Sequence, residues 1–278
     1  MSDYDLYYWS VPFRGQCVRA VLAYAGKAWT EGGDAAISKL MNVPVKHMPV
    51  PFMGPPMLID KKADFAIAQM PAIILYLGET LDLMPDNPAL RAMTMKIVND
   101  ANDVIDEITL DGGREMWTKK RWQDFIPRLK KWMSLWEETG RRHGLKADSG
   151  FLLGGKAPSI ADIVTASLWS TMTDRFSKIE AILGETAPMT AALTRRIADL
   201  PPLAKLAAKS SRIMATLIAA ARSRPRCARS WTLEHRNSLR HDAQAPDGRF
   251  PTKGRGRQDQ TIPLPARHRH VRMRLWRR

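Results

Sequence analysis

The stretch that decides the fold is residues 54–78, GPPMLIDKKADFAIAQMPAIILYLG. Residues 56–60 read as a strand entered through a proline pair. Because proline has no backbone N–H, Pro56 has to occupy the first position of that strand, where its peptide bond is free to be cis. Alternating apolar residues over 65–67 predict a second strand, so the two form a hairpin. The period then becomes helical over 71–78, with a proline at the start and a glycine at the end.

The residues before this stretch predict the rest of a small mixed sheet. Residues 6–9 indicate a strand, and residues 16–26 indicate a helix that stops at a glycine. A short strand over 28–31 returns beside the first, and a right-handed crossover makes the two parallel. Residues 32–53 are proline-rich and weakly periodic, so we expect a loop there with at most a short helix. The predicted order is βαβ, loop, ββα.

The second half of the sequence is helical almost throughout. Apolar residues form one helical stripe over 97–108, and large aromatic residues form another over 122–136. Ser159 and Asp162 have the spacing of a capping box that opens a further helix, so we interpret Asp162 as structural and not catalytic. Leucines and an isoleucine over 203–217 indicate a last helix.

Composition divides the chain into four parts. We predict an α/β domain at 1–80, a linker at 81–88, an all-helical domain at 89–221 and a basic tail at 222–278. The formal charge is +15, of which the tail carries +12 and the rest +3. The tail has several prolines and no apolar period, so we expect it to be disordered or loosely held. An accidental extension of the reading frame and an arm for nucleic acid or another acidic surface both stay open.

Several classes of protein are excluded by composition. The chain has 278 residues, 45% of them apolar, which is enough for one large domain or two modest ones. Its two cysteines, Cys17 and Cys227, lie far apart and in no metal-like spacing, which argues against a disulfide framework or a metal site. The first residues are acidic, and no apolar run approaches the roughly 18 residues of a membrane span. We therefore expect a cytoplasmic protein without a metal or a membrane segment.

Several motifs, in this order, resemble the cytosolic glutathione S-transferase family. GPPMLID stands at that family's cis-proline turn, AQMPAIILYLG at its glutamyl-binding helix and APSIADIVTASLW at its capping-box helix. YYWSVPFRGQCVRAVLAYAGKAW and IVNDANDVIDEI are similar to its tyrosine-type classes. The resemblance covers residues 4–215, and the family has no counterpart to the tail. It implies a thioredoxin-like N-terminal domain, an all-helical C-terminal domain and a detoxification enzyme that joins glutathione to hydrophobic electrophiles.

The chemistry implied by the resemblance requires a hydrogen-bond donor for a thiolate. Glutathione reacts as its thiolate, and a free thiol is mostly protonated at neutral pH. Lowering a thiol pKa by about two units takes roughly 2.7 kcal/mol, within reach of one charge-assisted hydrogen bond and helix dipoles. Tyr8 is our candidate donor, because it precedes Arg19 by the family's spacing. Ser10 is its rival, since other classes use serine, and we interpret Cys17 as a packing residue.

The resemblance also assigns positions that bind the tripeptide. The carbonyl of Pro55, before the expected cis bond to Pro56, would accept from the cysteinyl N–H of glutathione, but Pro55 has no N–H to donate in return. Gln69 and Met70 stand where the family binds the γ-glutamyl carboxylate, at a helix N-terminus suited to an anion. Met70 replaces the usual hydroxyl residue, so we expect weaker binding. Arg14 is expected to meet the glycyl carboxylate, with Lys39 or Lys46 as helpers.

The partner subunit and the electrophile are implied in the same way. Asp100 matches an acid that the family supplies from the partner subunit towards the glutamyl amine, although an ordinary solvated helix face would also explain it. Phe52 resembles the aromatic key of the family's dimer, so we expect a homodimer. The electrophile pocket is expected between the domains. Its expected residues are Val11, Phe13, Met116 and Trp117.

Two other functions stay open. The departures at Pro55 and Met70 favour a transferase-like binding module without catalysis. The basic tail alone favours nucleic acid, and the nearly neutral body argues against it. The electrophile cannot be deduced, and conjugation, peroxide reduction, dehalogenation and isomerisation all start from the same thiolate. Conjugation is preferred because it requires only the activated thiolate and an electrophile.

Overall fold

The computed structural model describes residues 2–113, 115 and 117–210. Its first part contains a four-stranded mixed sheet with the order β2-β1-β3-β4. β1 runs parallel to β2 and antiparallel to β3, and β3 pairs with β4 as the predicted hairpin. The strands are β1 (Tyr4–Tyr7), β2 (Trp29–Glu31), β3 (Met57–Asp60) and β4 (Phe65–Ala68).

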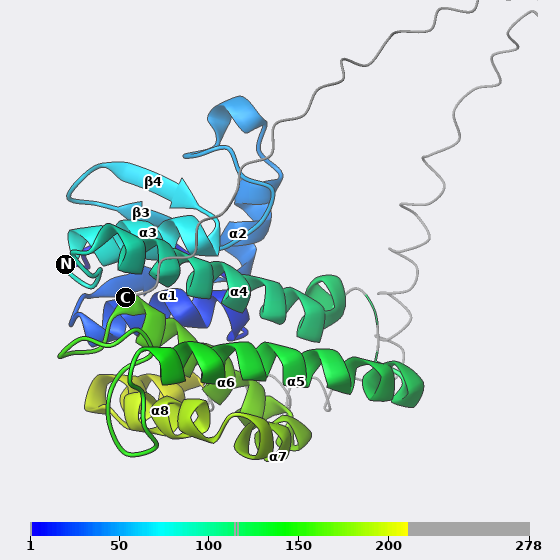
Figure 1. Cartoon of the computed structure of the whole chain (residues 1–278). Helices are drawn as coiled ribbons and strands as arrows, with labels where there is room; N and C mark the ends of the chain where they lie inside the picture. The colour runs from blue at the N-terminus through cyan, green and yellow to red at the C-terminus, as the bar shows by residue number, and fades with distance from the viewer. Residues whose placement is uncertain (1, 114, 116, 211–278) are drawn as a thin grey trace, which may run out of the picture. The chain divides into compact units, whose positions relative to one another are not determined.

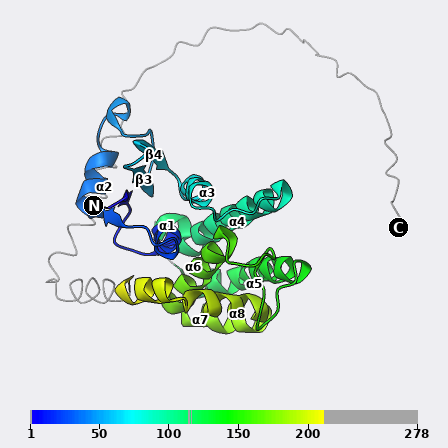
Figure 2. The same cartoon turned by 90° about the vertical axis from the view of Figure 1, so that its left-hand side faces the viewer.

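Helices cover both faces of this sheet. α1 and α3 lie on one face and α2 lies on the other (Figure 2). Val18, Val21 and Leu22 of α1 are fully buried, as their helical spacing predicts. The bounds are α1 (Phe13–Tyr24), α2 (Gly33–Met41), the 3₁₀ turn η1 (Val45–His47) and α3 (Met70–Thr80). This thioredoxin-like arrangement confirms the predicted fold class.

The second part is all-helical, also as predicted (Figure 1). α6 lies at its centre and packs against α1, α4, α7 and α8. Because α6 is covered on so many sides, its apolar residues are not confined to one stripe. The bounds are α4 (Pro88–Gly113), α5 (Lys119–Arg142), α6 (Ile160–Arg175), α7 (Ser177–Thr186) and α8 (Pro188–Ala198), and residues 201–210 form a further helix.

Two special features of the backbone are confirmed. The Pro55–Pro56 peptide bond is cis. Ser159 and Asp162 form the capping box of α6. The Asp162 carboxylate accepts from the backbone N–H of Ser159 at 2.9 Å and from that of Leu152 at 2.7 Å. Asp162 is therefore occupied by backbone hydrogen bonds that hold two segments together.

The structure agrees with the prediction for residues 32–53. This segment contains one short helix, α2, which is nine residues long, and the 3₁₀ turn η1 within an otherwise irregular stretch. Ile37 is the one residue of α2 that is buried. A helix that buries so little apolar surface leaves a weak periodic signal, which explains why the pattern did not fix its bounds.

Other boundaries are shifted. The first strand begins at Tyr4, earlier than the predicted 6–9, and α1 begins at Phe13, earlier than residue 16. α3 continues past Gly78 to Thr80. A Cβ atom on Gly78 would lie 2.8 Å from the Ile160 side chain. That glycine therefore permits close packing between α3 and α6 and does not end the helix.

Candidate active site

Three of the predicted site segments meet at one edge of the sheet. The last residue of β1 faces the first residue of β3, which in turn faces the last residue of β4. At this edge, β1 is followed by Tyr8, β3 is preceded by Pro56 and β4 is followed by Gln69. The N–H of Gln69 donates to the carbonyl of Pro56 at 3.1 Å. The sheet register therefore brings together the expected thiolate donor, the cis-proline turn and the start of the glutamyl-binding helix.

Helix N-termini also gather at this edge. β1, β2 and β4 each end there, and each leads into a helix: α1, α2 and α3 respectively. The unpaired N–H groups and the dipole of a helix give its N-terminus a partial positive charge. This edge is therefore suited to a ligand with negative charges, such as a peptide with two carboxylates and a thiolate.

Tyr8 is buried against the first turn of α1. It exposes 6% of its surface, and a Cβ atom on Gly15 would lie 2.2 Å from its ring. The guanidinium carbon of Arg19 lies 5.7 Å from the ring centroid. Burial raises the pKa of Tyr8, and the charge and backbone N–H of Arg14 and the charge of Arg19 offset this only in part. The phenol is therefore protonated at neutral pH and able to donate a hydrogen bond.

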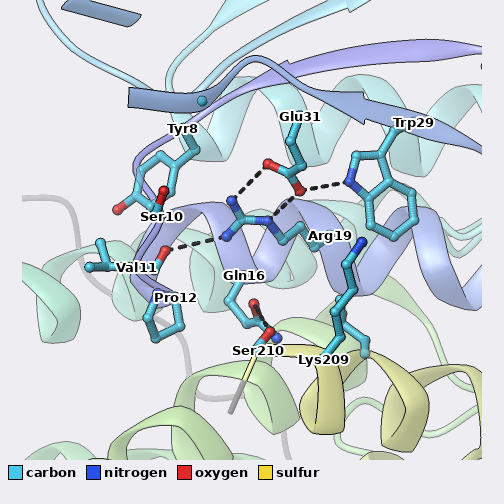
Figure 3. A pocket seen from close by; sticks show the side chains of 12 residues that line it. Tyr8, Ser10, Val11, Pro12, Gln16, Arg19, Trp29, Glu31, Lys209 and Ser210 are labelled. Carbon is cyan, nitrogen blue, oxygen red and sulfur yellow. Dashed lines mark hydrogen bonds and ion pairs between the residues drawn. The ribbon is translucent and has the colours of Figure 1, made fainter. Parts of the chain in front are cut away.

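Arg19 fixes the loop that carries Tyr8. Its guanidinium binds Glu31 through Nε at 2.7 Å and through Nη2 at 2.9 Å. It also donates to the carbonyls of Val11 at 3.3 Å and Trp9 at 3.4 Å. Burial alone would raise the pKa of Glu31, but the hydrogen bonds and charge of Arg19 outweigh it and lower that pKa. Arg19 thus ties the β1–α1 loop to β2 (Figure 3).

Ser10 is engaged with a carboxylate. Its hydroxyl donates to Oδ1 of Asp34 at 3.0 Å, and its N–H donates to the same oxygen at 2.8 Å. A hydroxyl whose proton points at a carboxylate has to give up a charge-assisted hydrogen bond before it can serve a thiolate. This geometry favours Tyr8 over Ser10 as the donor.

Arg14 contacts the helical part of the chain. Its Nε donates to Asn102 at 2.8 Å and its Nη2 donates to Asp106 at 2.9 Å, both on α4. Asp100, also on α4, forms an ion pair with Lys96. Burial raises the pKa of neighbouring Asp103, and the charges of nearby acids raise it further. The role of Arg14 at a glycyl carboxylate stays a prediction, with two existing partners to displace.

The residues that are expected to bind the tripeptide offer it mainly backbone groups. Pro56 is buried and Pro55 is half-buried. Gln69 is exposed, has a φ of 75° and caps α3, whereas the side chain of Met70 is fully buried. At Met70, the backbone N–H is therefore the group that remains for an anion.

Phe52, which is expected at the subunit interface, lies in the segment between η1 and β3. Phe52 is half-buried, and its neighbour Met53 exposes 89% of its surface. Lys39 and Lys46 are both exposed. A homodimer through Phe52 stays a prediction.

The expected electrophile residues do not lie in one cavity. Val11 lines a cavity beside Tyr8, and Phe13 packs against the core. Trp117 lies elsewhere: its ring is tilted against the ring of Phe125 with centroids 5.1 Å apart, and its Nε1 donates to the carbonyl of Ile108 at 2.8 Å. Met116 lies outside the described residues, as does the tail at 222–278.

The cavity beside Tyr8 has a volume of about 130 Å³. Its walls come from the β1–α1 loop, β2, the start of α2, α1 and the helix of residues 201–210. The lining residues are Tyr8, Ser10, Val11, Pro12, Gln16, Arg19, Trp29, Glu31, Gly33, Leu206, Lys209 and Ser210. Ser210 donates to the side chain of Gln16 at 3.3 Å, which joins the last described helix to α1 (Figure 3).

Four residues of this site were missed as functional by the sequence patterns: Gly15, Arg19, Glu31 and Asp34. In the sequence, Arg19 supports the choice of Tyr8 through its spacing alone and has no predicted role of its own. Its partner Glu31 belongs to a strand that pairs with β1, so their contact depends on tertiary structure. Gly15 carries no local signal, because its requirement comes from the ring of Tyr8.

Comparisons with known proteins agree with this architecture. Residues 93–221 match a family model described as the glutathione S-transferase C-terminal domain. NaGST-2 is similar in structure at 20% identity, with a TM-score of 0.60 over 74% of this chain and 95% of that one. The helical part of the chain therefore resembles the C-terminal domain of glutathione S-transferases, and the chain shares the fold of a solved structure of that name.

Two further solved structures have this glutathione S-transferase fold. The Pi-class glutathione S-transferase of Onchocerca volvulus is 18% identical, with a TM-score of 0.61 over 76% of this chain and 94% of that one. The glutathione S-transferase of Ascaris lumbricoides is 20% identical, with a TM-score of 0.61 over 75% of this chain and 97% of that one. A search among curated protein sequences finds no match.

Two features are absent from the described part of the chain. Within residues 2–113, 115 and 117–210, no three His, Cys, Asp or Glu side chains are grouped as a metal site would require. No helix in these ranges is long and apolar enough to span a bilayer.

Proposed function

We propose that this chain is a glutathione transferase in which Tyr8 donates a hydrogen bond to the thiolate of glutathione. The observation that carries the proposal is the buried, protonated phenol at the sheet edge beside the cis-proline turn. The thiolate then attacks an electrophile, and conjugation is the preferred reaction. Detoxification in the cytoplasm, as a homodimer, is the physiological setting that we propose.

A hydrogen bond from one phenol is strong enough to stabilise the thiolate of glutathione. A hydrogen bond to a charged partner contributes about 1.5–3 kcal/mol. That range matches the roughly 2.7 kcal/mol needed to lower a thiol pKa by two units. Tyr8 is buried, so water competes little for its hydroxyl, and the N-terminus of α1 adds a favourable dipole.

The tripeptide would bind mainly through backbone groups. The carbonyl of Pro55 accepts from the cysteinyl N–H, and the N–H of Met70 meets the γ-glutamyl carboxylate with the help of Gln69. Asp100 of a second copy faces the glutamyl amine. Because Pro55 gives no N–H and Met70 gives no hydroxyl, we expect a weaker affinity than a fully equipped site provides.

Binding and turnover test the proposal together. Calorimetric titration with glutathione measures binding, and turnover with 1-chloro-2,4-dinitrobenzene measures thiolate attack. Tyr8→Phe should lower kcat/KM at least tenfold, whereas the matched variant Tyr7→Phe and the rival variant Ser10→Ala should retain it. Loss of activity in Ser10→Ala with full activity in Tyr8→Phe would assign the thiolate to Ser10. No binding at millimolar glutathione would remove the enzyme function altogether.

A second candidate is a binding module without catalysis. The fully buried side chain of Met70 and the missing N–H of Pro55 both favour it, since each removes one ligand contact. This candidate predicts retention on immobilised glutathione without turnover. Nucleic acid binding through the tail is a weaker alternative, and it predicts salt-sensitive binding that is lost when residues 222–278 are deleted.

A further inference from the structure

We propose that the cavity beside Tyr8 selects electrophiles that have a body of one ring and carry an anionic group, which Lys209 binds. This inference rests on the proposed function, because it names the substrate class of that site. Lys209 was not among the predicted site residues. It lies on the helix of residues 201–210 and lines the same cavity as Tyr8.

The volume of the cavity limits the apolar body. A cavity of about 130 Å³ is close to the roughly 150 Å³ cavity that holds one benzene molecule in another protein. Val11, Pro12 and Leu206 give it aliphatic walls, and Trp29 gives it an aromatic wall. One six-membered ring therefore fits between the β1–α1 loop and the last described helix, whereas fused rings require the cavity to open.

The charges on the walls do not cancel. Arg19 and Glu31 neutralise each other through two hydrogen bonds. Lys209 adds a positive charge close enough to lower the pKa of Glu31 slightly. Among residues 2–210 as far as they are described, no carboxylate forms an ion pair with Lys209. The charged residues that line the cavity, Arg19, Glu31 and Lys209, therefore sum to one positive charge, which favours an anionic group beside Lys209, and the carboxylate of Asp34 is bound by Ser10.

Tyr8 and Lys209 line different walls of this cavity. Tyr8 follows β1, and Lys209 comes from the helix of residues 201–210, with Arg19 between them in the view of Figure 3. An anion held by Lys209 would place the opposite end of a ring towards the thiolate. For an aryl chloride, the thiolate sulfur forms a C–S bond with the ring carbon, the C–Cl bond breaks and chloride leaves with the bonding pair. The thiol proton has already passed to solvent.

A pair of probes that differ in charge tests the preference. 4-Chloro-3-nitrobenzoate and 4-chloro-3-nitrobenzamide share the ring and the leaving group, so the ratio of their kcat/KM values, corrected for their rates with free glutathione, isolates the anion. We expect the enzyme to prefer the benzoate about tenfold at low salt. Because Lys209 is exposed, this preference should shrink as salt increases.

Two variants assign the preference to one side chain. Lys209→Met should abolish it, because kcat/KM for the benzoate falls about tenfold more than kcat/KM for the benzamide. The matched variant Lys205→Met, one helical turn earlier on the same exposed surface, should keep it. An unchanged preference in Lys209→Met, or an equal loss in Lys205→Met, would overturn the inference.

A measurement without glutathione separates this inference from the proposed function. Calorimetry with the unreactive pair 3-nitrobenzoate and 3-nitrobenzamide should give about tenfold tighter binding of the benzoate, lost in Lys209→Met. If this holds while glutathione does not bind, the cavity is an anion-selective site and the proposed function fails. If glutathione is turned over but neither benzoate is preferred over its matching benzamide, the proposed function stands and the inference is wrong.

Discussion

The β1–α1 loop and the α4–α5 end of the molecule are both rich in aromatic residues, yet their aromatic side chains have different partners. Tyr8 is held by Gly15 and Arg19, and the partner of its hydroxyl oxygen is the backbone N–H of Arg14, which leaves the phenol proton free to be donated. Trp117 packs on other aromatic rings and donates its N–H to a helix carbonyl. A buried polar group that already has its partner stabilises the fold. One that faces a ligand-binding edge is available for chemistry.

The largest expected effect comes from Gly15→Ala. The new methyl group would lie 2.2 Å from the Tyr8 ring, so the ring has to move and the phenol leaves its position. We expect kcat/KM to fall about a hundredfold, which amounts to loss of the donor. Gly184→Ala on α7 meets no atom within 4 Å and should leave turnover unchanged. Full activity in Gly15→Ala would show that the position of the ring is not critical.

Arg19→Met tests whether the ion pair positions the loop. Glu31 would remain without its partner, which costs up to about 3 kcal/mol, and less here because the side chain of Glu31 is 35% exposed. The double variant Arg19→Met/Glu31→Leu should recover most of the unfolding free energy but not kcat, because the carbonyls of Trp9 and Val11 still lack their donor. Recovery of kcat would reduce Arg19 to a purely stabilising residue.

Trp117→Leu tests the other side of the comparison. It removes ring contacts and one hydrogen bond to a helix carbonyl, so the free energy of unfolding in urea should fall by about 1–2 kcal/mol. Because Trp117 does not line the cavity beside Tyr8, kcat/KM should stay within twofold for small aryl chlorides. A large loss of turnover would restore Trp117 to the electrophile pocket.

The smallest effect is the acid dependence of stability. The pKa of Glu31 is lowered in the folded state, so its contribution to stability is present above the usual glutamate pKa of about 4.3 and is lost as pH falls through the lower folded value. Glu31→Gln should therefore lose more stability at pH 7 than at pH 3. Equal losses at both pH values would show that the charge of Glu31 contributes nothing.

Much of this architecture was predictable because it depends on local patterns. The hairpin and the capping box at Ser159 follow from residue types within a few positions, whereas the cis Pro55–Pro56 bond was expected from the family resemblance. The bounds of α2 could not be predicted because it buries one residue. Tyr8 could be named from its spacing, but the engagement of Ser10 by Asp34 and of Arg14 by α4 depends on contacts between distant segments. Such contacts leave no periodic trace in one sequence.

The most direct test of the account is the pKa of the glutathione thiol when bound, measured from thiolate absorbance across pH. The account predicts a pKa about two units below that of free glutathione in the unmodified protein and in Tyr7→Phe, and a return towards the free value in Tyr8→Phe. A bound thiol whose pKa stays low in Tyr8→Phe would contradict the central role of this phenol.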